Sequence, residues 1–414
     1  MGNLLVMKYG GKSLANLDLI RAVALYIKER LSHQAELKIA VVVSAMNNRT
    51  DEILENMRAL NPDSPERELA AALQVGETES AAYLATAITS LGVKARSYNA
   101  LQLGIQTFGG HDKARIKGID RECLDRAFSE NRVIVVAGYQ GVSDLSRSEI
   151  AVLGRGGSDI TAVALAAELR CDVEFYKAGV AGVHTFDPRI SKKARVFKHL
   201  RFAPAISLAE YGYEFLMTRS LQVAERFGVT IEFRQTPGLL DHDPWKVATI
   251  IDPGETHDIE ENNDPLCAVA VKEHQTLIVF GGVPNIPGWS DKIYSLVDVP
   301  FIDSWQASFG NKATVAILIN EEDTDNMLST LSRIQSDEVT LMITRNLANV
   351  TLIHSQANSE SRIFYRIGKW LHEAGVNIQA QYSSGMFIHT LVSCSDLNAA
   401  VLTLAKEFGL EETA

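Results

Sequence analysis

The sequence contains few cysteines and no long apolar stretch. Its 414 residues include only 4 cysteines, which are far apart and form no CxxC pair, so neither a disulfide scaffold nor a structural zinc site is expected. No apolar run approaches the ~20 residues that a membrane-spanning helix needs, and the first residues lack the basic and apolar regions of an export signal. We therefore expect a cytoplasmic protein that does not contact a membrane.

Basic residues are also fewer than acidic residues. Lys and Arg total 40 against 51 Asp and Glu, and the formal net charge of -11 is opposite to that of a protein that binds a phosphate backbone. Nucleic acid is therefore not an expected partner. Because 46% of the residues are hydrophobic, the chain can bury a sizeable core. At about 150 residues per domain, the length predicts two or three domains.

Up to about residue 235, short apolar runs alternate with longer helical patterns. This alternation predicts an α/β domain in which a largely parallel central sheet lies between helices. Residues 38–44 and 132–139 are the clearest buried strands, since almost no polar residue interrupts them. Residues 66–91 and 159–169 have the composition and spacing of helices.

The segment 241–264 is acidic and rich in residues that break helices and strands, and we place a linker there. Beyond it, residues 276–297 and 349–378 share a weak internal likeness, in which a strand, a turn, an amphipathic helix and another strand follow one another. The sequence thus predicts an N-terminal domain over 1–240 and two α+β modules over 265–340 and 341–414.

Two glycine-rich segments carry groups that bind anions. In the first, Gly10 and Gly11 follow a strand that contains Lys8, and Lys12 and Ser13 come next. Paired glycines let backbone N–H groups approach an anion, and lysine neutralises phosphate charge. An ordinary strand-to-helix turn explains this segment equally well.

The second glycine-rich segment is Leu153–Asp159. Its three glycines surround Arg155, whose guanidinium suits bidentate binding of a carboxylate, and Asp159 stands at a predicted helix start. Ser158 or Asp159 as a helix cap is the simpler explanation, but a cap does not require a preceding glycine-rich loop.

Two further segments place polar groups near strand or helix ends. Gly76 interrupts a helical stretch, at a cost of about 1 kcal/mol relative to alanine, and Glu77 follows it. Ser44 ends a buried strand, where sites open in parallel α/β sheets. A surface acid and a plain loop are the alternatives. The four segments together predict a basic phosphate site and a site for a small anionic substrate.

Taken in order, these segments of residues 3–235 resemble the motifs of the aspartate kinases, which have the amino acid kinase fold. MKYGGKSLAN, VVAGYQGV and LGRGGSDITAVALAAEL carry the resemblance. The remainder resembles the paired regulatory ACT modules of that family, and the loop 283–288 fits the ligand turn of the first module.

The resemblance implies ATP-dependent phosphorylation of the β-carboxylate of L-aspartate to 4-phospho-L-aspartate. It also implies Mg2+ carried on the nucleotide without a metal site of the protein's own. An amino acid effector and a homo-oligomer formed through the ACT-like modules are further implications.

The resemblance assigns roles to individual residues. The implied catalytic residues are Lys8, which stabilises charge on the transferred phosphoryl group, and Asp159. The implied substrate-binding residues are Ser44, Glu77, Tyr139, Arg155 and Ser158. The implied nucleotide-binding residues are Lys8, Gly10, Gly11, Ser13, His184 and Arg189.

The nucleotide half departs from the family pattern. Where the family reads YTDVDGVYTADPR, residues 177–189 read KAGVAGVHTFDPR, and Glu214 replaces a family lysine. Three hypotheses follow: an aspartate kinase with altered nucleotide binding, a kinase for another small amino acid, or a non-catalytic protein that binds an amino acid or a partner subunit. Lys12, where the family has threonine, is a candidate to compensate for the lost lysine. A dehydrogenase is disfavoured because no GxGxxG follows the first strand.

Overall fold

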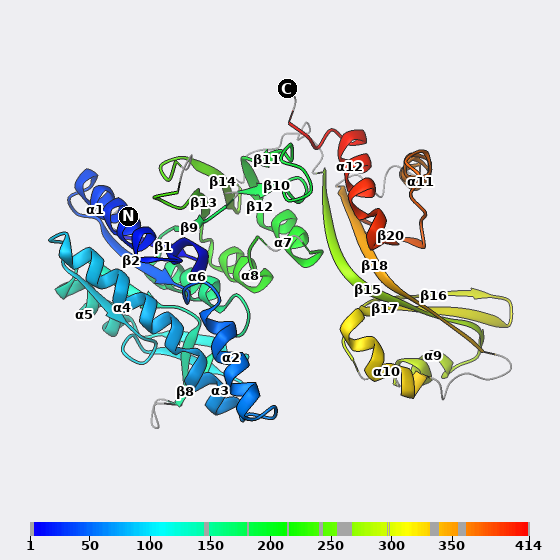
Figure 1. Cartoon of the computed structure of the whole chain (residues 1–414), viewed down its shortest axis with the longest axis horizontal. Coiled ribbons are helices and arrows are strands. Elements are labelled where there is room, and N and C mark those ends of the chain that lie inside the picture. The colour runs from blue at the N-terminus through cyan, green and yellow to red at the C-terminus, as the bar shows by residue number, and fades with distance from the viewer. Residues whose placement is uncertain are drawn as a thin grey trace. The chain divides into compact units, whose positions relative to one another are not determined.

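The computed structural model describes residues 4–144, 149–179, 182–212, 215–239, 243–254, 267–295, 297, 299–331, 339–354 and 362–412. Its chain divides into two compact units (Figure 1). The first comprises residues 1–183, 196–210 and 214–261, and the second comprises residues 184–195, 211–213 and 262–414. Among the described helices, none is both long and apolar enough to span a bilayer.

An eight-stranded sheet forms the centre of the first unit, in the order β12-β14-β13-β9-β1-β2-β6-β3. Neighbouring strands are parallel except for β13 and β14. The strands are β1 Leu4–Tyr9, β2 Lys38–Val43, β3 Ala95–Tyr98, β6 Val133–Ala137, β9 Val173–Lys177, β12 His199–Arg201, β13 Ile231–Gln235 and β14 Val247–Asp252. The predicted α/β class with a largely parallel sheet is confirmed.

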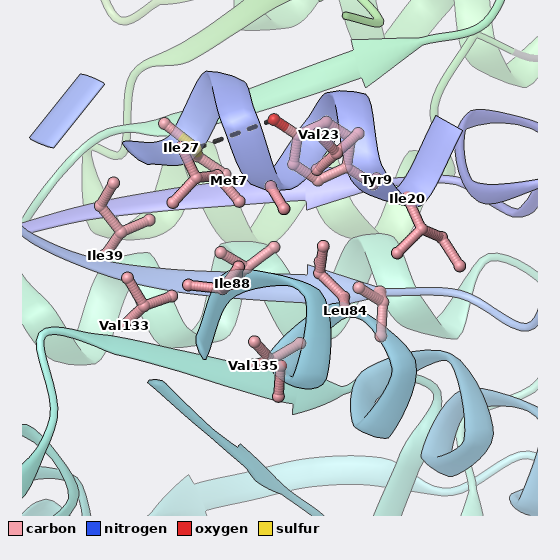
Figure 2. Packing of buried hydrophobic residues seen from close by; sticks show 14 of the residues in the cluster. Met7, Tyr9, Ile20, Val23, Ile27, Ile39, Leu84, Ile88, Val133 and Val135 are labelled. Carbon is pink, nitrogen blue, oxygen red and sulfur yellow. Dashed lines mark hydrogen bonds between the residues drawn. The ribbon is translucent and has the colours of Figure 1, made fainter. Parts of the chain in front are cut away.

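Helices cover both faces of this sheet because its central strands are apolar on both sides. The helices of this unit are α1 Leu17–His33, α2 Arg49–Leu60, α3 Glu66–Leu73, α4 Val75–Ser90, α5 Arg121–Glu130, α6 Gly157–Leu169, α7 Phe202–Glu210 and α8 Thr218–Phe227, with a short 3-10 turn η1 at Gly11–Leu14. Alternate residues of β1, β2 and β6 pack against α1 and α4, as Figure 2 shows for Met7, Ile39 and Val135. Burying each such side chain stabilises the fold by about 1.5–3 kcal/mol.

The helix expected over residues 66–91 is two helices, α3 and α4, which meet at Gln74. A close approach explains the glycine near the break: a Cβ at Gly76 would lie 2.7 Å from the Cβ of Ala45. A second, four-stranded sheet also belongs to this unit, in the order β5-β4-β7-β8. Its strands are β4 Ile105–Phe108, β5 Arg115–Ile119, β7 Gln140–Asp144 and β8 Glu149–Val152.

The second unit contains an antiparallel six-stranded sheet in the order β16-β17-β15-β18-β20-β19. Its strands are β15 Cys267–Pro284, β16 Phe301–Phe309, β17 Lys312–Asn320, β18 Thr340–His354, β19 Ala380–Ser384 and β20 Phe387–Ser393. Its helices are α9 Trp289–Tyr294, α10 Thr324–Leu331, α11 Ile363–Glu373 and α12 Leu397–Glu407, with 3-10 turns η2 Glu321–Asp323 and η3 Cys394–Asp396. The short strands β10 Val183–His184 and β11 Val196–Phe197 form a separate two-stranded sheet.

Strands β15 and β18 are long enough to serve both halves of the second unit. Residues 267–272 of β15 pair with residues 349–354 of β18, whereas residues 275–281 pair with residues 340–347. One apolar cluster gathers α11 and α12, and another includes residues of α9 and α10. A division at residue 340 therefore passes through one continuous sheet, and the division into two ACT-like modules stays a prediction.

Candidate active site

The site forms at the carboxyl edge of the main sheet. Strand register aligns Tyr9 with Val43, and Val43 with Ala137, so three strand ends lie side by side. The loops that follow them carry Gly10, Ser44 and Tyr139. In a parallel sheet this edge is where ligands bind, because loops and helix starts converge there.

Lys8 and Asp159 form a nearly buried ion pair at this edge. The Nζ atom of Lys8 lies 2.5 Å from Oδ1 of Asp159, and the two side chains are 10% and 11% exposed. Lys8 comes from β1, and Asp159 comes from the first turn of α6, so the tertiary fold joins the two glycine-rich segments. Removal of one partner of such a pair leaves an uncompensated charge, which costs about 3–5 kcal/mol.

A cavity of about 280 Å³ opens beside Lys8. It is lined by Lys8, Gly10, Gly11, Lys12, Ser13, Tyr176, Lys177, Ala178 and Gly179. Glycine is required at position 11, where a Cβ would lie 2.3 Å from the carbonyl oxygen of Ala45. The Ser13 hydroxyl contacts the carbonyl oxygen of Tyr176 at 3.1 Å and the Thr236 hydroxyl at 2.7 Å, so it supports the loop from behind.

Lys177 is the residue that our sequence analysis missed. It ends β9, and its Nζ donates to the carbonyl oxygen of Phe215 at 2.8 Å. Burial lowers the pKa of Lys177 to about 8, partly offset by Asp159, and Lys8 lowers it further. The available signal was a lysine at the end of the short run VEFYK, directly before the small residues Ala178 and Gly179. Lys8, Lys12 and Lys177 thus bring three ammonium groups to one small cavity.

Glu77 lies in the first turn of α4 and is only 3% exposed. Burial raises its pKa to about 7, against the opposing effects of the backbone of Ala45 and Glu77 and of the charge on Lys8. Its Oε2 atom is buried and has no hydrogen-bond partner among the described residues. An unpaired buried carboxylate oxygen is a costly feature in a folded protein, and it is typical of a position where a ligand supplies the partner.

Tyr139 holds an unusual backbone conformation beside Glu77. Its φ of 72° lies in the left-handed region, which costs a non-glycine residue about 1–3 kcal/mol. The Tyr139 N–H donates to the Thr161 hydroxyl at 3.2 Å, and the Tyr139 carbonyl accepts from Leu153 N–H at 2.8 Å. Burial raises its pKa to about 12, with further contributions from the charges of Glu77 and Asp112. These bonds fix the strand end against the second glycine-rich segment.

The second glycine-rich segment needs its glycines for backbone reasons. Gly154 and Gly156 have φ of 76° and 68°, and a Cβ at Gly156 would lie 1.8 Å from the Cγ of Met217. Arg155 is exposed between them and has no hydrogen bond or ion pair within the described residues. Ser158 is buried in the following helix start, and a Cβ at Gly138 would lie 2.8 Å from its Cβ. The loop therefore presents a free guanidinium next to a tightly packed helix start.

Comparison with known proteins identifies the family of the chain. The family model described as "Amino acid kinase family" matches residues 3–235. An aspartokinase of Mycolicibacterium smegmatis is 33% identical over 415 residues, with 98% of this chain and 96% of the relative covered. The chain belongs to the aspartokinases of the amino acid kinase family. Two crystal structures of E. coli aspartokinase III share its fold at 20% identity, and each covers 98% of this chain and 99% of its own. The complex with aspartate and ADP (R-state) has a TM-score of 0.73, and the complex with lysine and aspartate (T-state) has 0.70.

In this member of the aspartokinases, the predicted site residues fall into two groups. The first unit contains Lys8, Gly10, Gly11, Ser13, Ser44, Glu77, Tyr139, Arg155, Ser158 and Asp159, and their roles stay predictions. His184 is buried and Arg189 pairs with Asp187 at 2.5 Å, and both belong to the second unit, so their part in nucleotide binding stays a prediction. Ala181 and Glu214, two of the departures from the family pattern, lie outside the described residues.

Proposed function

We propose that the chain transfers the γ-phosphoryl group of ATP to the β-carboxylate of L-aspartate. A carboxylate oxygen attacks the γ-phosphorus, the bond to the β,γ-bridging oxygen breaks, and 4-phospho-L-aspartate and ADP leave. The observation that carries this proposal is the Lys8–Asp159 pair, which joins a lysine-lined cavity to the loop that presents Arg155. The full-length likeness to aspartokinases supports it.

The phosphate side of the site works by position and charge, as phosphoryl transfer requires. Asp159 holds the Lys8 ammonium in place, so Lys8 stabilises charge on the transferred group without having to reorganise. Lys12 and Lys177 bind the remaining phosphate charge, and the backbone of Gly10 and Gly11 approaches closely because no side chain intervenes.

ATP is proposed as the donor, and E. coli aspartokinase III in complex with ADP supports a nucleotide in the cavity. The described residues include no group of three or more His, Cys, Asp or Glu side chains that could hold a metal ion. We propose that Mg2+ arrives on the nucleotide, as the resemblance implies, where it would neutralise charge on the phosphate oxygens. Asp159 is the acidic side chain beside the Lys8 ammonium.

The substrate side recognises an amino acid by its charges. Arg155 grips the α-carboxylate in a bidentate contact, and Glu77 accepts from the α-ammonium. That ammonium also favours the ionised form of Glu77, whose pKa in the free site is about 7. Ser44, Ser158 and Tyr139 then orient the side-chain carboxylate toward the cavity.

Regulation is proposed for the second unit. The lysine complex of E. coli aspartokinase III supports an amino acid effector, and a homo-oligomer formed through the ACT-like modules goes with it. In the loop 283–288, Asn285 N–H donates to the Asn311 carbonyl at 2.9 Å, and the Asn285 side chain donates to the Gly310 carbonyl at 3.0 Å. These bonds shape the predicted effector turn.

The test is ADP release from MgATP with and without L-aspartate, with hydroxylamine to trap the acyl phosphate. Aspartate-dependent hydroxamate that disappears in Lys8→Ala and Asp159→Ala, but persists in the surface control Lys28→Ala, is the expected result. Aspartate binding by calorimetry without any turnover would favour a non-catalytic role. Ala178 and Gly179, which line the cavity where the family pattern has threonine and aspartate, are the residues that would then explain the loss of nucleotide binding. Turnover with a different acid alone would replace the substrate.

A further inference from the structure

The first unit has a second and larger cavity, which the proposed reaction does not use. It is a groove of about 640 Å³ lined by β5, by one face each of α6 and α8, and by Phe108 of β4. We refer to it as the β5–α8 groove. Its volume lies within the ~300–1,000 Å³ that small-molecule sites occupy.

Positive charge dominates the groove. Arg115 and Lys117 come from β5, and Arg219 and Arg226 come from α8, whereas Glu168 is the one acidic side chain in the lining. Within the described part of the chain, none of these four cations forms an ion pair with a carboxylate. Such a cluster is unexpected on a chain with a net charge of -11, because uncompensated cations repel one another.

Two backbone carbonyl groups fix the guanidinium of Arg219 in the groove. Its Nη1 and Nη2 donate to the carbonyl oxygens of Leu153 and Ala114, both at 3.3 Å. Burial and the nearby charge of Arg115 both lower the pKa of Arg219, so the protein meets a cost to keep these two guanidiniums together. An anion between them relieves that cost, and the fixed guanidinium loses little freedom when it binds.

The remaining walls are apolar. Ile160 is buried at the bottom, while Phe108 and Phe227 are 53% and 59% exposed along the rim. The Arg226 guanidinium lies 5.6 Å from the centroid of the Phe227 ring. Half-exposed aromatic rings beside guanidiniums that lack a carboxylate partner present both an apolar and a cationic surface to the same occupant.

We propose that the β5–α8 groove binds a small amphipathic organic anion, with its carboxylate or phosphate group between Arg115 and Arg219 and its apolar body against Phe227. Charge complementarity selects the anionic group, and the half-exposed rings select the apolar body.

The probe is 8-anilinonaphthalene-1-sulfonate, an aromatic anion whose fluorescence rises on binding, titrated into the full chain. We expect Arg115→Glu to raise its Kd at least about tenfold and the matched surface variant Lys28→Glu to leave it unchanged. Phe227→Ala should also weaken binding, whereas Phe309→Ala, which removes an exposed ring in the second unit, should not. Because Arg115 and Phe227 are exposed, these variants test the groove without disturbing the core.

Equal affinity in Arg115→Glu and the unaltered chain would overturn the proposal. A second copy of this chain is the alternative occupant, and sedimentation velocity tests for it. If the unaltered chain is an oligomer that dissociates in Arg115→Glu, the groove is an interface between copies of this chain, and the small-molecule site is overturned. Neither readout depends on turnover, so failure of the proposed kinase activity leaves this test intact. Hexyl phosphate and heptanoate, each added in competition with the probe, distinguish a phosphate group from a carboxylate group. If neither compound displaces the probe, the proposed anion site is contradicted.

Discussion

Two charged clusters each include a residue of β9, Lys177 in one and Glu174 in the other, and they differ in whether the protein completes its own charge pairing. Lys8, Lys12 and Lys177 line the cavity, and Lys8 is the member of this set that forms an ion pair, with Asp159, within the described residues. In the second cluster, the Glu174 side chain is 4% exposed. Its Oε1 atom lies 3.0 Å from Nη2 of Arg30 and 3.2 Å from Nε of Arg234. The first cluster leaves charge for a ligand, whereas the second is satisfied internally.

The internal cluster is a hydrogen-bonded network in addition to an ion triplet. The Tyr176 hydroxyl donates to Glu174 at 2.6 Å, and Arg234 donates to Glu232 at 2.6 Å and to the Trp245 carbonyl at 2.6 Å. The ring of Tyr176 also stacks on Tyr9 with centroids 4.5 Å apart. This stacking links the network on β9 to β1, the strand that carries Lys8, and the register places Lys8 opposite Phe175, two residues before Lys177. The difference teaches that charge without an internal partner, more than charge itself, marks the functional cluster.

The largest expected effect separates the two clusters by activity. Lys8→Met should lower kcat about 100- to 1,000-fold, because it removes a preorganised cation from the transferred phosphoryl group. The hydroxamate assay measures the loss, and Lys28→Met serves as the surface control. A kcat within a factor of three of the unaltered chain would show that Lys8 is not the catalytic cation.

The second effect separates them by stability. Glu174→Gln should lower the free energy of unfolding by about 3–5 kcal/mol, because Arg30 loses its carboxylate partner and Arg234 keeps only Glu232. Urea unfolding measures it. The exposed pair of Arg121 and Asp125 provides the control, since Asp125→Asn should cost less than about 1 kcal/mol. Similar losses in the two variants would remove the distinction between the clusters.

The third effect is a pH dependence of nucleotide binding. The protonated form of Lys177 binds phosphate, and its pKa is about 8 in the free site, so ATP affinity should fall as the pH rises through 8. From pH 7 to pH 9 the loss approaches about tenfold, the change in the protonated fraction. Calorimetry in the unaltered chain and in Lys177→Met checks this, and a profile that stays equally steep in the variant would assign the titration to another group.

The fourth effect concerns the aspartate side and has the opposite sign. Ionised Glu77 accepts from the α-ammonium of aspartate, and its pKa is about 7, so aspartate affinity should rise by up to about tenfold between pH 6 and pH 8. Glu77→Gln should bind aspartate weakly at both pH values. Retention of the rise in that variant would contradict the assigned role.

The smallest effect tests the exposed member of the lysine cluster. Lys12→Thr should raise the Kd for ATP about threefold and leave kcat unchanged, since a solvated ammonium contributes only about 0.2–1 kcal/mol. Unchanged affinity would leave Lys177, rather than Lys12, as the residue that compensates for the lost family lysine.

Local pattern determined much of this protein. The apolar runs predicted the central strands, and the glycine-rich segments predicted the loops at their ends, because backbone freedom and periodicity are read from neighbouring residues. Gly156 shows this well: its left-handed φ and its contact with Met217 both require the absence of a Cβ. The resemblance named Lys8 and Asp159 as catalytic residues, but their ion pair was not predicted.

Only the tertiary structure decided how distant segments meet. It placed the Lys177 ammonium on the Phe215 carbonyl beside the phosphate loop, and it split the expected 66–91 helix where α4 passes close to Ala45. It also spread β15 and β18 over both halves of one sheet, although the internal likeness suggested consecutive modules. Periodicity describes which face of an element is apolar, but it does not say which other element that face meets. Long-range packing alone settles that choice, and with it the charges that remain free to bind a ligand.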